Sequence, residues 1–340
     1  MSWSGMPEPN INYEPRHYIC RRAEGALALD GRVDKPFWEA AVWSEDFVDI
    51  EGDLKPKPTK RTRVKMLWDD EYFYFAAEME EDQIWATLTE RDSVIFYDKD
   101  FEIFIDPDGD SHQYYEFEIN ALNTVWDLLL VKPYRDGGPP VNGWDIAGLK
   151  TAVHIDGELN NPEAGSKKWS VEVAIPWQSL RECAAEGRPP VAGEFWRVNF
   201  SRVEWQTDVK EGQYRKVLNP DTGKPYPEDN WVWSPMGLIN MHYPELWGYV
   251  MFSDGVRGEE FELSRDEMIK WELRKLYYKQ RNYYEQHGAF TADAGLLMGE
   301  EMWSIEPVIE TTRSMFQITV PSSDGLSMLC IREDGKLWKE

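Results

Sequence analysis

The chain has 340 residues, with 62 Asp or Glu against 37 Lys or Arg, so its formal net charge at pH 7 is −25. Such an acidic surface repels phosphate groups, which argues against a nucleic acid or an anionic membrane as partner. Aromatic residues make up 14% of the chain and include 17 Trp. This excess fits either a large core or a surface on which flat ligands stack, and composition does not choose between them.

Three cysteines (Cys20, Cys183 and Cys330) lie far apart and form no CxxC pair. We therefore expect no zinc or redox site and at most one disulfide. No apolar run approaches the roughly 18 residues that would suggest a bilayer span, so we expect no membrane insertion. Residues 1–10 lack a basic segment followed by an apolar one, and no signal peptide is visible. The residues alone leave the compartment open.

Short strands separated by turn residues are predicted from residue 18 to residue 252. Residues 63–79 contain two apolar runs split by acidic residues 69–71, which predicts a hairpin. A strand is expected at 101–106, followed by a turn at 107–110. Residues 114–120 then alternate, which predicts a half-buried strand whose outer face is strongly polar. That outer face carries Tyr114, Glu116, Glu118 and Asn120.

Further strands are predicted at 169–175, 196–200 and 247–252, and helical periodicity is largely missing from this part of the chain. Many short strands of this kind indicate an all-β fold, an antiparallel β-sandwich. The stretches 132–145 and 208–230 are long for loops inside a compact domain, which favours a functional role for them.

The pattern changes after Asp254. A capping box at residues 264–267 begins a helix that is expected to run to His287 and stop at Gly288. A hairpin is expected beyond it, with strands at 315–320 and 326–338 around a turn at 322–325. We therefore divide the chain into a sandwich at residues 18–253 and a small α+β extension at residues 254–340.

The strand segments resemble, in this order, the carbohydrate-binding modules of family 9. The matching segments are LDGRVDKPFWEAA at 29–41, WDDEYFY at 68–74, FEIFID at 101–106, VEVAIPW at 171–177 and WG at 247–248. The resemblance covers roughly residues 18 to 253. It implies a β-sandwich that holds sugar between two aromatic rings above polar side chains, and an extracellular or periplasmic protein involved in polysaccharide degradation.

The positions implied by this resemblance are only partly kept. The first ring falls on or near Phe96 or Tyr97. The second falls near Met241 and His242, where the expected Trp is missing, although Trp231 or Trp233 could replace it. The family's Arg-x-Asn pair becomes Glu118 and Asn120. The resemblance therefore implies a divergent branch with a reshaped site.

Candidate ligand contacts follow from the chemistry of sugars, whose hydroxyls both donate and accept hydrogen bonds and whose C–H faces stack on rings. An Arg guanidinium would suit an acidic sugar or several hydroxyls. Each candidate also has a structural alternative: polar residues on an exposed sheet face, tryptophans in the core, and a surface salt bridge for Arg202. The candidates are Tyr97, Glu118, Asn120, Trp126, Trp144, Arg202, Trp205, Trp231 and His242.

A structural calcium ion is the one cofactor considered. Asp106, Asp108 and Asp110 alternate along the turn that follows the strand at 101–106, and calcium favours such carboxylates. Some members of the family carry structural calcium. Asp and Gly are also what any tight turn selects, and the loop lacks the remaining ligands of an EF-hand.

Three functions remain open. The first is a non-catalytic protein that binds a plant or bacterial polysaccharide or oligosaccharide. The second is a glycoside hydrolase or polysaccharide lyase that uses carboxylates in the same cleft, with Glu116, Glu118, Asp127 and Glu204 as candidates. The third is a haem-binding sandwich, for which His242 with Met241 or Met236 would supply the axial ligands. The sequence does not indicate an oligomeric state.

Overall fold

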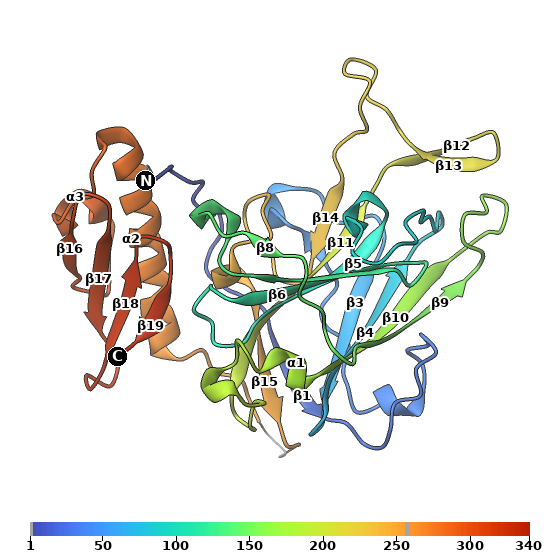
Figure 1. Ribbon diagram of the computed structural model, residues 1–340, viewed down its shortest axis with the longest axis horizontal. Helices are drawn as coiled ribbons and strands as arrows, with labels where there is room; N and C mark the ends of the chain where they lie inside the picture. Colours follow the sequence, from blue (N-terminus) through green and yellow to red (C-terminus); the bar gives the residue numbers. More distant parts are fainter. Residues whose placement is uncertain (1–2, 256–258) are drawn as a thin grey trace.

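The computed structural model describes residues 3–255 and 259–340. Its main feature is a 13-stranded, largely antiparallel sheet that curls over to form the two layers of a sandwich (Figure 1). The predicted all-β class is therefore confirmed. One layer contains β8 (Pro140–Val141), β7 (Val125–Leu130), β6 (Tyr114–Asn120), β5 (Asp100–Asp106), β11 (Phe195–Glu204), β14 (Asp229–Val232) and β2 (Val48–Asp49).

The second layer continues from the first half of β11. It contains β15 (Gly248–Ser253), β1 (His17–Arg22), β3 (Thr62–Trp68), β4 (Tyr72–Glu80), β10 (Lys168–Pro176) and β9 (Lys150–Asp156). β1 pairs in parallel with both β15 and β3, and the other pairings in the two layers are antiparallel. β3 and β4 form the hairpin that the sequence predicts at residues 63–79.

Alternating apolar residues of the two layers face each other across the main core. Val171 and Phe75 of one layer and Phe117, Ile103 and Phe200 of the other belong to the same buried cluster. Packing of these inner faces fixes which side chains of β5 and β6 point outward, because successive residues of a strand alternate between faces.

The outer face of β6 differs from its prediction. We expected a half-buried strand, but all seven residues of β6 are buried. Its outer face is covered by the segment that carries the short helix η3 (Ile95–Tyr97) and by residues 239–242, which lie over the same surface. Polar side chains of β6 are therefore enclosed rather than solvated.

The C-terminal part contains α2 (Arg265–His287), α3 (Ala294–Met298) and a four-stranded sheet. Ser264 accepts a hydrogen bond from the Glu267 amide at the start of α2, and Gly288 ends the helix with a positive φ, as the sequence predicts. The expected strand at 326–338 is instead broken by a turn at Gly335. The sheet consists of β16 (Val308–Thr311), β17 (Phe316–Pro321), β18 (Met328–Arg332) and β19 (Leu337–Lys339).

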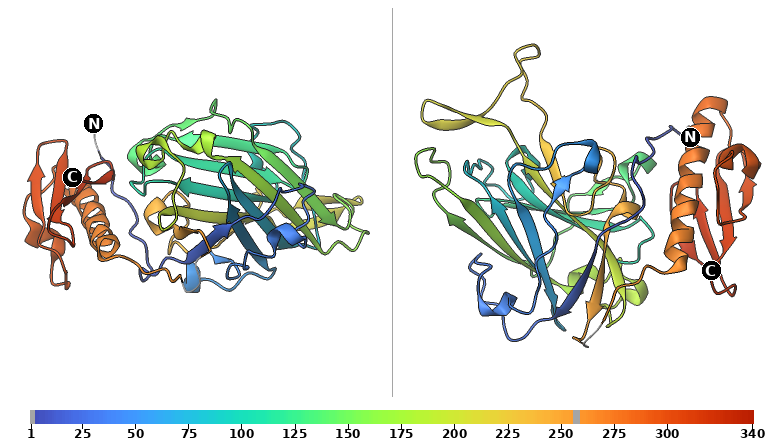
Figure 2. Two further views of the ribbon diagram at one scale, coloured as in Figure 1. Left: turned by 90° about the horizontal axis from the view of Figure 1, so that it is seen from below. Right: turned by 180° about the vertical axis from the view of Figure 1, so that it is seen from behind.

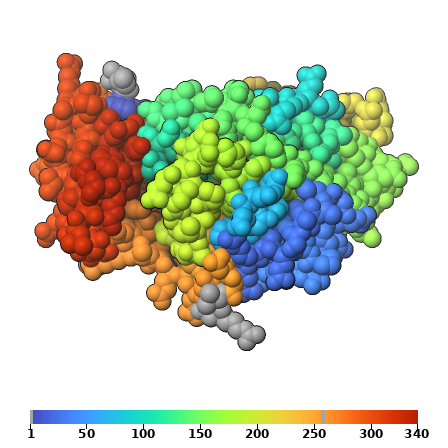
Figure 3. Space-filling model, turned by 60° about the horizontal axis from the view of Figure 1, so that its bottom comes forward, coloured from blue at the N-terminus to red at the C-terminus, as the bar shows by residue number. Residues whose placement is uncertain are grey.

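Helix α2 lies between its own sheet and the sandwich (Figure 2). Leu273 and Leu276 of α2 share an apolar cluster with Phe104 and Trp247 of the sandwich. Arg281 Nη1 lies 2.6 Å from Asp136 Oδ1, so a buried ion pair joins the two parts. The C-terminal residues form a compact block against one end of the sandwich (Figure 3).

The remaining elements are short. The two-stranded hairpin of β12 (Thr207–Lys210) and β13 (Gln213–Lys216) projects from the sandwich and occupies part of the predicted long loop at 208–230 (Figure 1). None of the described helices is long and apolar enough to cross a membrane. The short helices are α1 (Trp177–Leu180), η1 (Pro36–Trp38), η2 (Gly52–Leu54), η4 (Tyr134–Asp136), η5 (Ala185–Gly187) and η6 (Pro244–Leu246).

Candidate functional site

A cavity of about 250 Å³ opens on the outer face of β5 and β6, and we call it the acidic cleft. Its floor comes from β5 and β6, and its sides come from η3, from residues 239–242 and from the segment at β14. The residues that line it are Ile50, Phe96, Glu102, Phe104, Glu116, Glu118, Val203, Glu228, Asn230, Ile239, Asn240, Met241 and His242.

Strand register gathers carboxylates on the floor of the acidic cleft. Glu102 of β5 pairs directly with Glu118 of β6, and Phe104 pairs with Glu116. Asp100, Glu102 and Glu118 each place one carboxylate oxygen within 4.8 Å of the others. Like charges opposite each other destabilise a sheet, so this arrangement has an energetic cost.

Burial changes the protonation of these acids. Glu102 is 5% exposed, Glu116 is 6% exposed and Glu118 is 1% exposed. Burial raises the pKa of Glu102 to about 7. Burial, together with the neighbouring carboxylates, raises the pKa of Glu116 and that of Glu118 well above the ordinary value. Near neutral pH the floor therefore holds protons that ordinary glutamates would release.

One wall of the acidic cleft is the segment of η3. The Phe96 amide donates a hydrogen bond to Glu118 Oε2 at 3.0 Å, which fixes this segment over the floor. The Phe96 ring lies 6.4 Å from the Trp126 ring and 5.0 Å from the Tyr97 ring. Tyr97 is 56% exposed and does not line the acidic cleft, and Lys216 Nζ lies 5.8 Å from its ring centroid.

The opposite wall carries Met241 and His242. His242 Nδ1 shares a hydrogen bond of 2.8 Å with the Tyr114 hydroxyl, and its carbonyl accepts one from Arg135 Nη1 at 2.9 Å. Burial and the nearby Arg135 lower the pKa of His242 to about 3. The imidazole is therefore neutral at physiological pH and brings no positive charge to the acidic cleft.

The structure brings together several residues that the sequence singles out. Phe96, Glu118, Met241 and His242 line one cavity, although the first and last of them are far apart in the chain. Trp126 pairs with Glu118 on the same face of the sheet. Met236, in contrast, is fully buried away from the cleft lining, and its sulfur accepts a hydrogen bond from Asn199.

Asn120 is occupied by structural contacts. Its amide nitrogen donates to the Leu88 carbonyl and to Asp98 Oδ2, and its amide oxygen accepts from the backbone amides of Leu122 and Thr124. The side chain holds the turn between β6 and β7. It does not line the acidic cleft.

Arg202 and Glu204 lie outside the acidic cleft, in a buried ion cluster. Arg202 Nη2 is 2.8 Å from Glu81 and 3.1 Å from Glu204, and Lys99 Nζ is 2.7 Å from Glu204. Trp231 packs in the main core, where the Arg202 guanidinium lies 5.1 Å from the ring centroid. These residues stabilise the sandwich end and are not brought to the same cavity as Glu118.

Trp205, Trp144 and Asp127 are also engaged within the protein. The Trp205 indole donates to the carbonyls of Phe96 and Asp98 and so supports the η3 segment from behind. Trp144 stacks on Tyr115 with ring centroids 4.8 Å apart and packs against the main core. Asp127 is buried, pairs with Arg91 and accepts the Ile146 amide.

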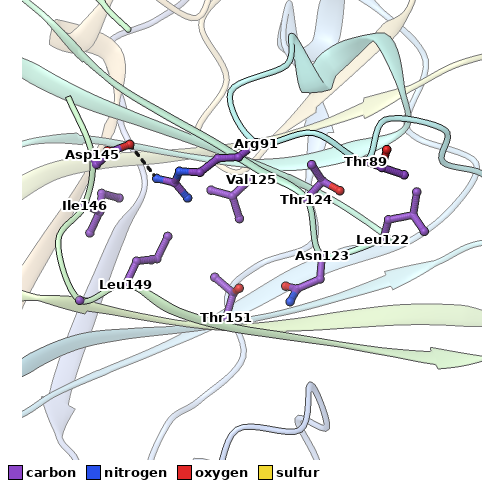
Figure 4. Close-up of a pocket in the computed structure, with 11 residues that line it drawn as sticks. Thr89, Arg91, Leu122, Asn123, Thr124, Val125, Asp145, Ile146, Leu149 and Thr151 are labelled. Carbon is purple, nitrogen blue, oxygen red and sulfur yellow. Dashed lines mark hydrogen bonds and ion pairs between the residues drawn. The ribbon is translucent and has the colours of Figure 1, made fainter. Parts of the chain in front are cut away.

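A second cavity, of about 560 Å³, lies near the start of β7 (Figure 4). Asp145 and Arg91 form an ion pair of 3.1 Å at its edge. Its lining is threonine-rich, and no aromatic ring of the described residues contributes to it. It therefore lacks a stacking surface, and the smaller acidic cleft is the better candidate for a ligand.

The turn after β5 brings Asp106, Asp108 and Asp110 together, with one oxygen of each within 4.8 Å of the others. Burial and the two neighbouring carboxylates raise the pKa of Asp106 well above its usual value. Oxygen donors of this kind fit calcium. Asp106 also accepts the Gly109 and Ser111 amides, so the turn is ordered by its own hydrogen bonds.

Glu102, Glu228 and Asn230 line the acidic cleft but were not among the sequence candidates. A signal for Glu102 was present in the sequence: Phe101, Ile103 and Ile105 face the core, so Glu102 must face outward beside Glu118. Glu228 and Asn230 lie in a segment without a clear strand pattern, and no comparable signal marked them.

Comparisons with known proteins agree with this architecture. Residues 29–189 match the family model described as carbohydrate family 9 binding domain-like. A crystal structure from Bacteroides uniformis, provisionally named a carbohydrate-binding protein, aligns with a TM-score of 0.52 at 14% identity. That alignment covers 71% of this chain and 100% of the other. The comparison with curated protein sequences found no match.

A family 9 carbohydrate-binding module from Caldicellulosiruptor kristjanssonii, in complex with cellotriose, aligns at 16% identity over 73% of this chain and 100% of that one. Its TM-score is 0.44. The family match and the sandwich together define the class, a β-sandwich of the family 9 type. Residues 29–189 of this chain are therefore similar to the family 9 modules, and the C-terminal residues 254–340 lie outside that match.

Proposed function

We propose that the protein binds carbohydrate in the acidic cleft. One observation carries this proposal: the two wall positions implied by the family resemblance, at Phe96 and at Met241–His242, line the same cavity above Glu118. The family match over residues 29–189 supports a sugar as the ligand, and it includes the floor and the first wall.

The lining suits a small sugar unit. Pockets for drug-sized ligands usually measure about 300–1,000 Å³, so a cavity of about 250 Å³ fits a ligand of roughly one ring. Carboxylates and the amides of Asn230 and Asn240 can exchange hydrogen bonds with hydroxyls. The exposed Tyr97 ring, which lies 5.0 Å from the Phe96 ring of the lining, offers a stacking face to a further sugar.

Binding to a glycan array, followed by calorimetry on the glycans retained, tests this proposal. Tyr97→Ala and Glu118→Gln should each weaken binding, whereas Glu310→Gln should not, because Glu310 is exposed on the C-terminal sheet. Retention that is unchanged in both cleft variants would contradict a site in the acidic cleft.

A glycan-active enzyme is the second candidate function, and one feature favours it. Glu102 and Glu118 place oxygens within 4.8 Å of each other, and the raised pKa of Glu102 would let it act as an acid near pH 7. Retaining glycosidases hold two carboxyl groups about 5–5.5 Å apart. New reducing ends released from polysaccharide, and lost in Glu118→Gln, would favour hydrolysis over binding alone.

We also propose that the turn of Asp106, Asp108 and Asp110 holds structural calcium. The donor type and the closeness of the three carboxylates support this assignment. The ion would offset the mutual repulsion of the carboxylates and would take no part in sugar binding, because none of the three residues lines the acidic cleft.

A further inference from the structure

Buried glutamates in this protein fall into two groups. Outside the acidic cleft, each buried glutamate among the described residues has a Lys or Arg nitrogen within 4.0 Å. Buried charges are normally compensated in this way, since removal from water is costly. The pairs are Glu78–Lys168, Glu81–Arg202, Glu172–Lys35, Glu204–Lys99, Glu245–Arg135 and Glu267–Lys270.

The three buried glutamates of the acidic cleft form the second group. Within residues 3–255 and 259–340, no Lys or Arg pairs with Glu102, Glu116 or Glu118. Asp100, in contact with this cluster, has a buried carboxylate oxygen without a hydrogen-bond partner. His242 faces the same space but is held neutral. Among the described residues, none gives the floor the positive charge that the other buried glutamates receive.

The uncompensated side chains adjoin an open space. Glu102, Glu116 and Glu118 all line the cavity, so a ligand in it would contact three enclosed carboxylates at once. Hydrogen bonds between an ammonium group and a carboxylate are roughly twice as strong as neutral ones, and enclosure strengthens them further. A ligand that carries a positive charge would complete the arrangement found at the other buried glutamates.

We propose that Glu102, Glu116 and Glu118 receive a protonated amine, so that the acidic cleft selects glycans containing amino sugars with free amino groups. This inference rests on the proposed function, since it specifies which class of carbohydrate the acidic cleft takes. The net charge of −25 also favours the approach of a cationic glycan over long range.

A bare metal ion fits the acidic cleft less well than an amine on a ring. Calcium takes six to eight oxygen ligands at about 2.3–2.6 Å, which calls for a closely fitted cage. The cavity is instead large enough for a ring and is partly lined by Phe96, Phe104 and Ile239. An amine on a sugar places its charge on the carboxylates while its ring occupies the apolar part.

Calorimetry with three matched tetrasaccharides tests the inference: β-1,4-linked glucosamine, its N-acetylated form and cellotetraose. We expect the free-amine oligomer to bind about 10- to 100-fold more tightly than the other two, as one or two charge-assisted hydrogen bonds would give. Glu116→Gln and Glu118→Gln should remove most of that preference. Glu310→Gln, the same residue change at an exposed position outside the acidic cleft, should keep it.

Measurements of the heat of binding in two buffers of different ionisation enthalpy add a second readout. Binding of an amine to carboxylates that hold protons should release protons, and Glu116→Gln should reduce the number released. A merely structural role of the glutamate would leave this number unchanged.

The other outcomes separate the two proposals. Equal binding of all three tetrasaccharides, dependent on the acidic cleft, would overturn the amine inference and leave carbohydrate binding intact. Failure of a broad glycan panel to bind would overturn both. Calcium binding without sugar, abolished by Glu118→Gln and accompanied by no amine preference, would assign the floor to a metal instead.

Discussion

Replacement of Glu102 by glutamine should stabilise the folded protein, and more strongly at pH 8 than at pH 5. Glu102 is 5% exposed, faces Glu118 across the strand pair and has no Lys or Arg partner among the described residues. Glutamine has nearly the same shape but carries no charge. The substitution therefore removes an uncompensated buried charge without opening a cavity.

The size of the effect follows from the pKa of Glu102, which burial raises from 4.5 to about 7. Between these values the folded state holds a proton that the unfolded state has released, so stability falls as pH rises through this window. At about 1.4 kcal/mol per pKa unit, the loss amounts to about 3 kcal/mol above pH 7. It is small near pH 5.

Urea unfolding at pH 5 and pH 8, followed by tryptophan fluorescence, measures this effect. The difference in unfolding free energy between Glu102→Gln and wild type should grow from about 1 kcal/mol at pH 5 to about 3 kcal/mol at pH 8. A difference that is equal at the two pH values would refute the idea that burial holds a proton on Glu102.

Glu204→Gln is the matched control, since Glu204 is also a buried strand glutamate but is paired. Arg202, Lys99 and Lys60 outweigh the effect of burial and lower the pKa of Glu204 to about 2. Its stabilising contribution is complete above pH 4.5 and is lost as pH falls towards 2. Glu204→Gln should therefore destabilise the protein by about 3 kcal/mol at pH 8. If both variants stabilised the protein, pairing with Lys or Arg would not decide whether the substitution raises or lowers the free energy of unfolding.

Three further predictions concern side chains around the sandwich. Tyr97→Ala should weaken glycan binding by about 1–2 kcal/mol in calorimetry while leaving the melting temperature unchanged, because the ring is largely exposed. Trp144→Ala should lower the unfolding free energy by roughly 3 kcal/mol in urea and leave glycan affinity unchanged, because its ring packs on Tyr115. Calcium should raise the melting temperature relative to EDTA. At a calcium concentration 100 times the dissociation constant, binding adds about 2.7 kcal/mol to the free energy of unfolding. Asp108→Asn should abolish the rise in melting temperature.

Local patterns in the sequence were sufficient for the sandwich. The alternation at residues 114–120 gave the bounds of β6, and Ser264 with Gly288 gave the limits of α2. These features depend on neighbours within a few residues, so they are visible in one sequence. Coverage of the outer face of β6 depends on residues 239–242, more than 100 positions away, and the strand was therefore expected to be more exposed than it is.

Strand periodicity and the family resemblance pointed to side chains that the structure brings to one cavity, whereas several isolated candidates lie elsewhere. Glu118 and His242 line the acidic cleft, as a shared site requires. Arg202 and Trp144 do not, because a charged or aromatic residue near a strand end can equally be satisfied inside the protein. The Arg202 guanidinium pairs with Glu81, and the Trp144 ring stacks on Tyr115.

The C-terminal extension contacts residues that position one wall of the acidic cleft, although it lies outside the family match. Arg135 donates to the His242 carbonyl and pairs with Glu245 at 2.8 Å, so it positions the second wall. Glu245 in turn accepts the hydroxyl of Tyr278 from α2. The helix thereby holds an acid that orients the arginine behind His242.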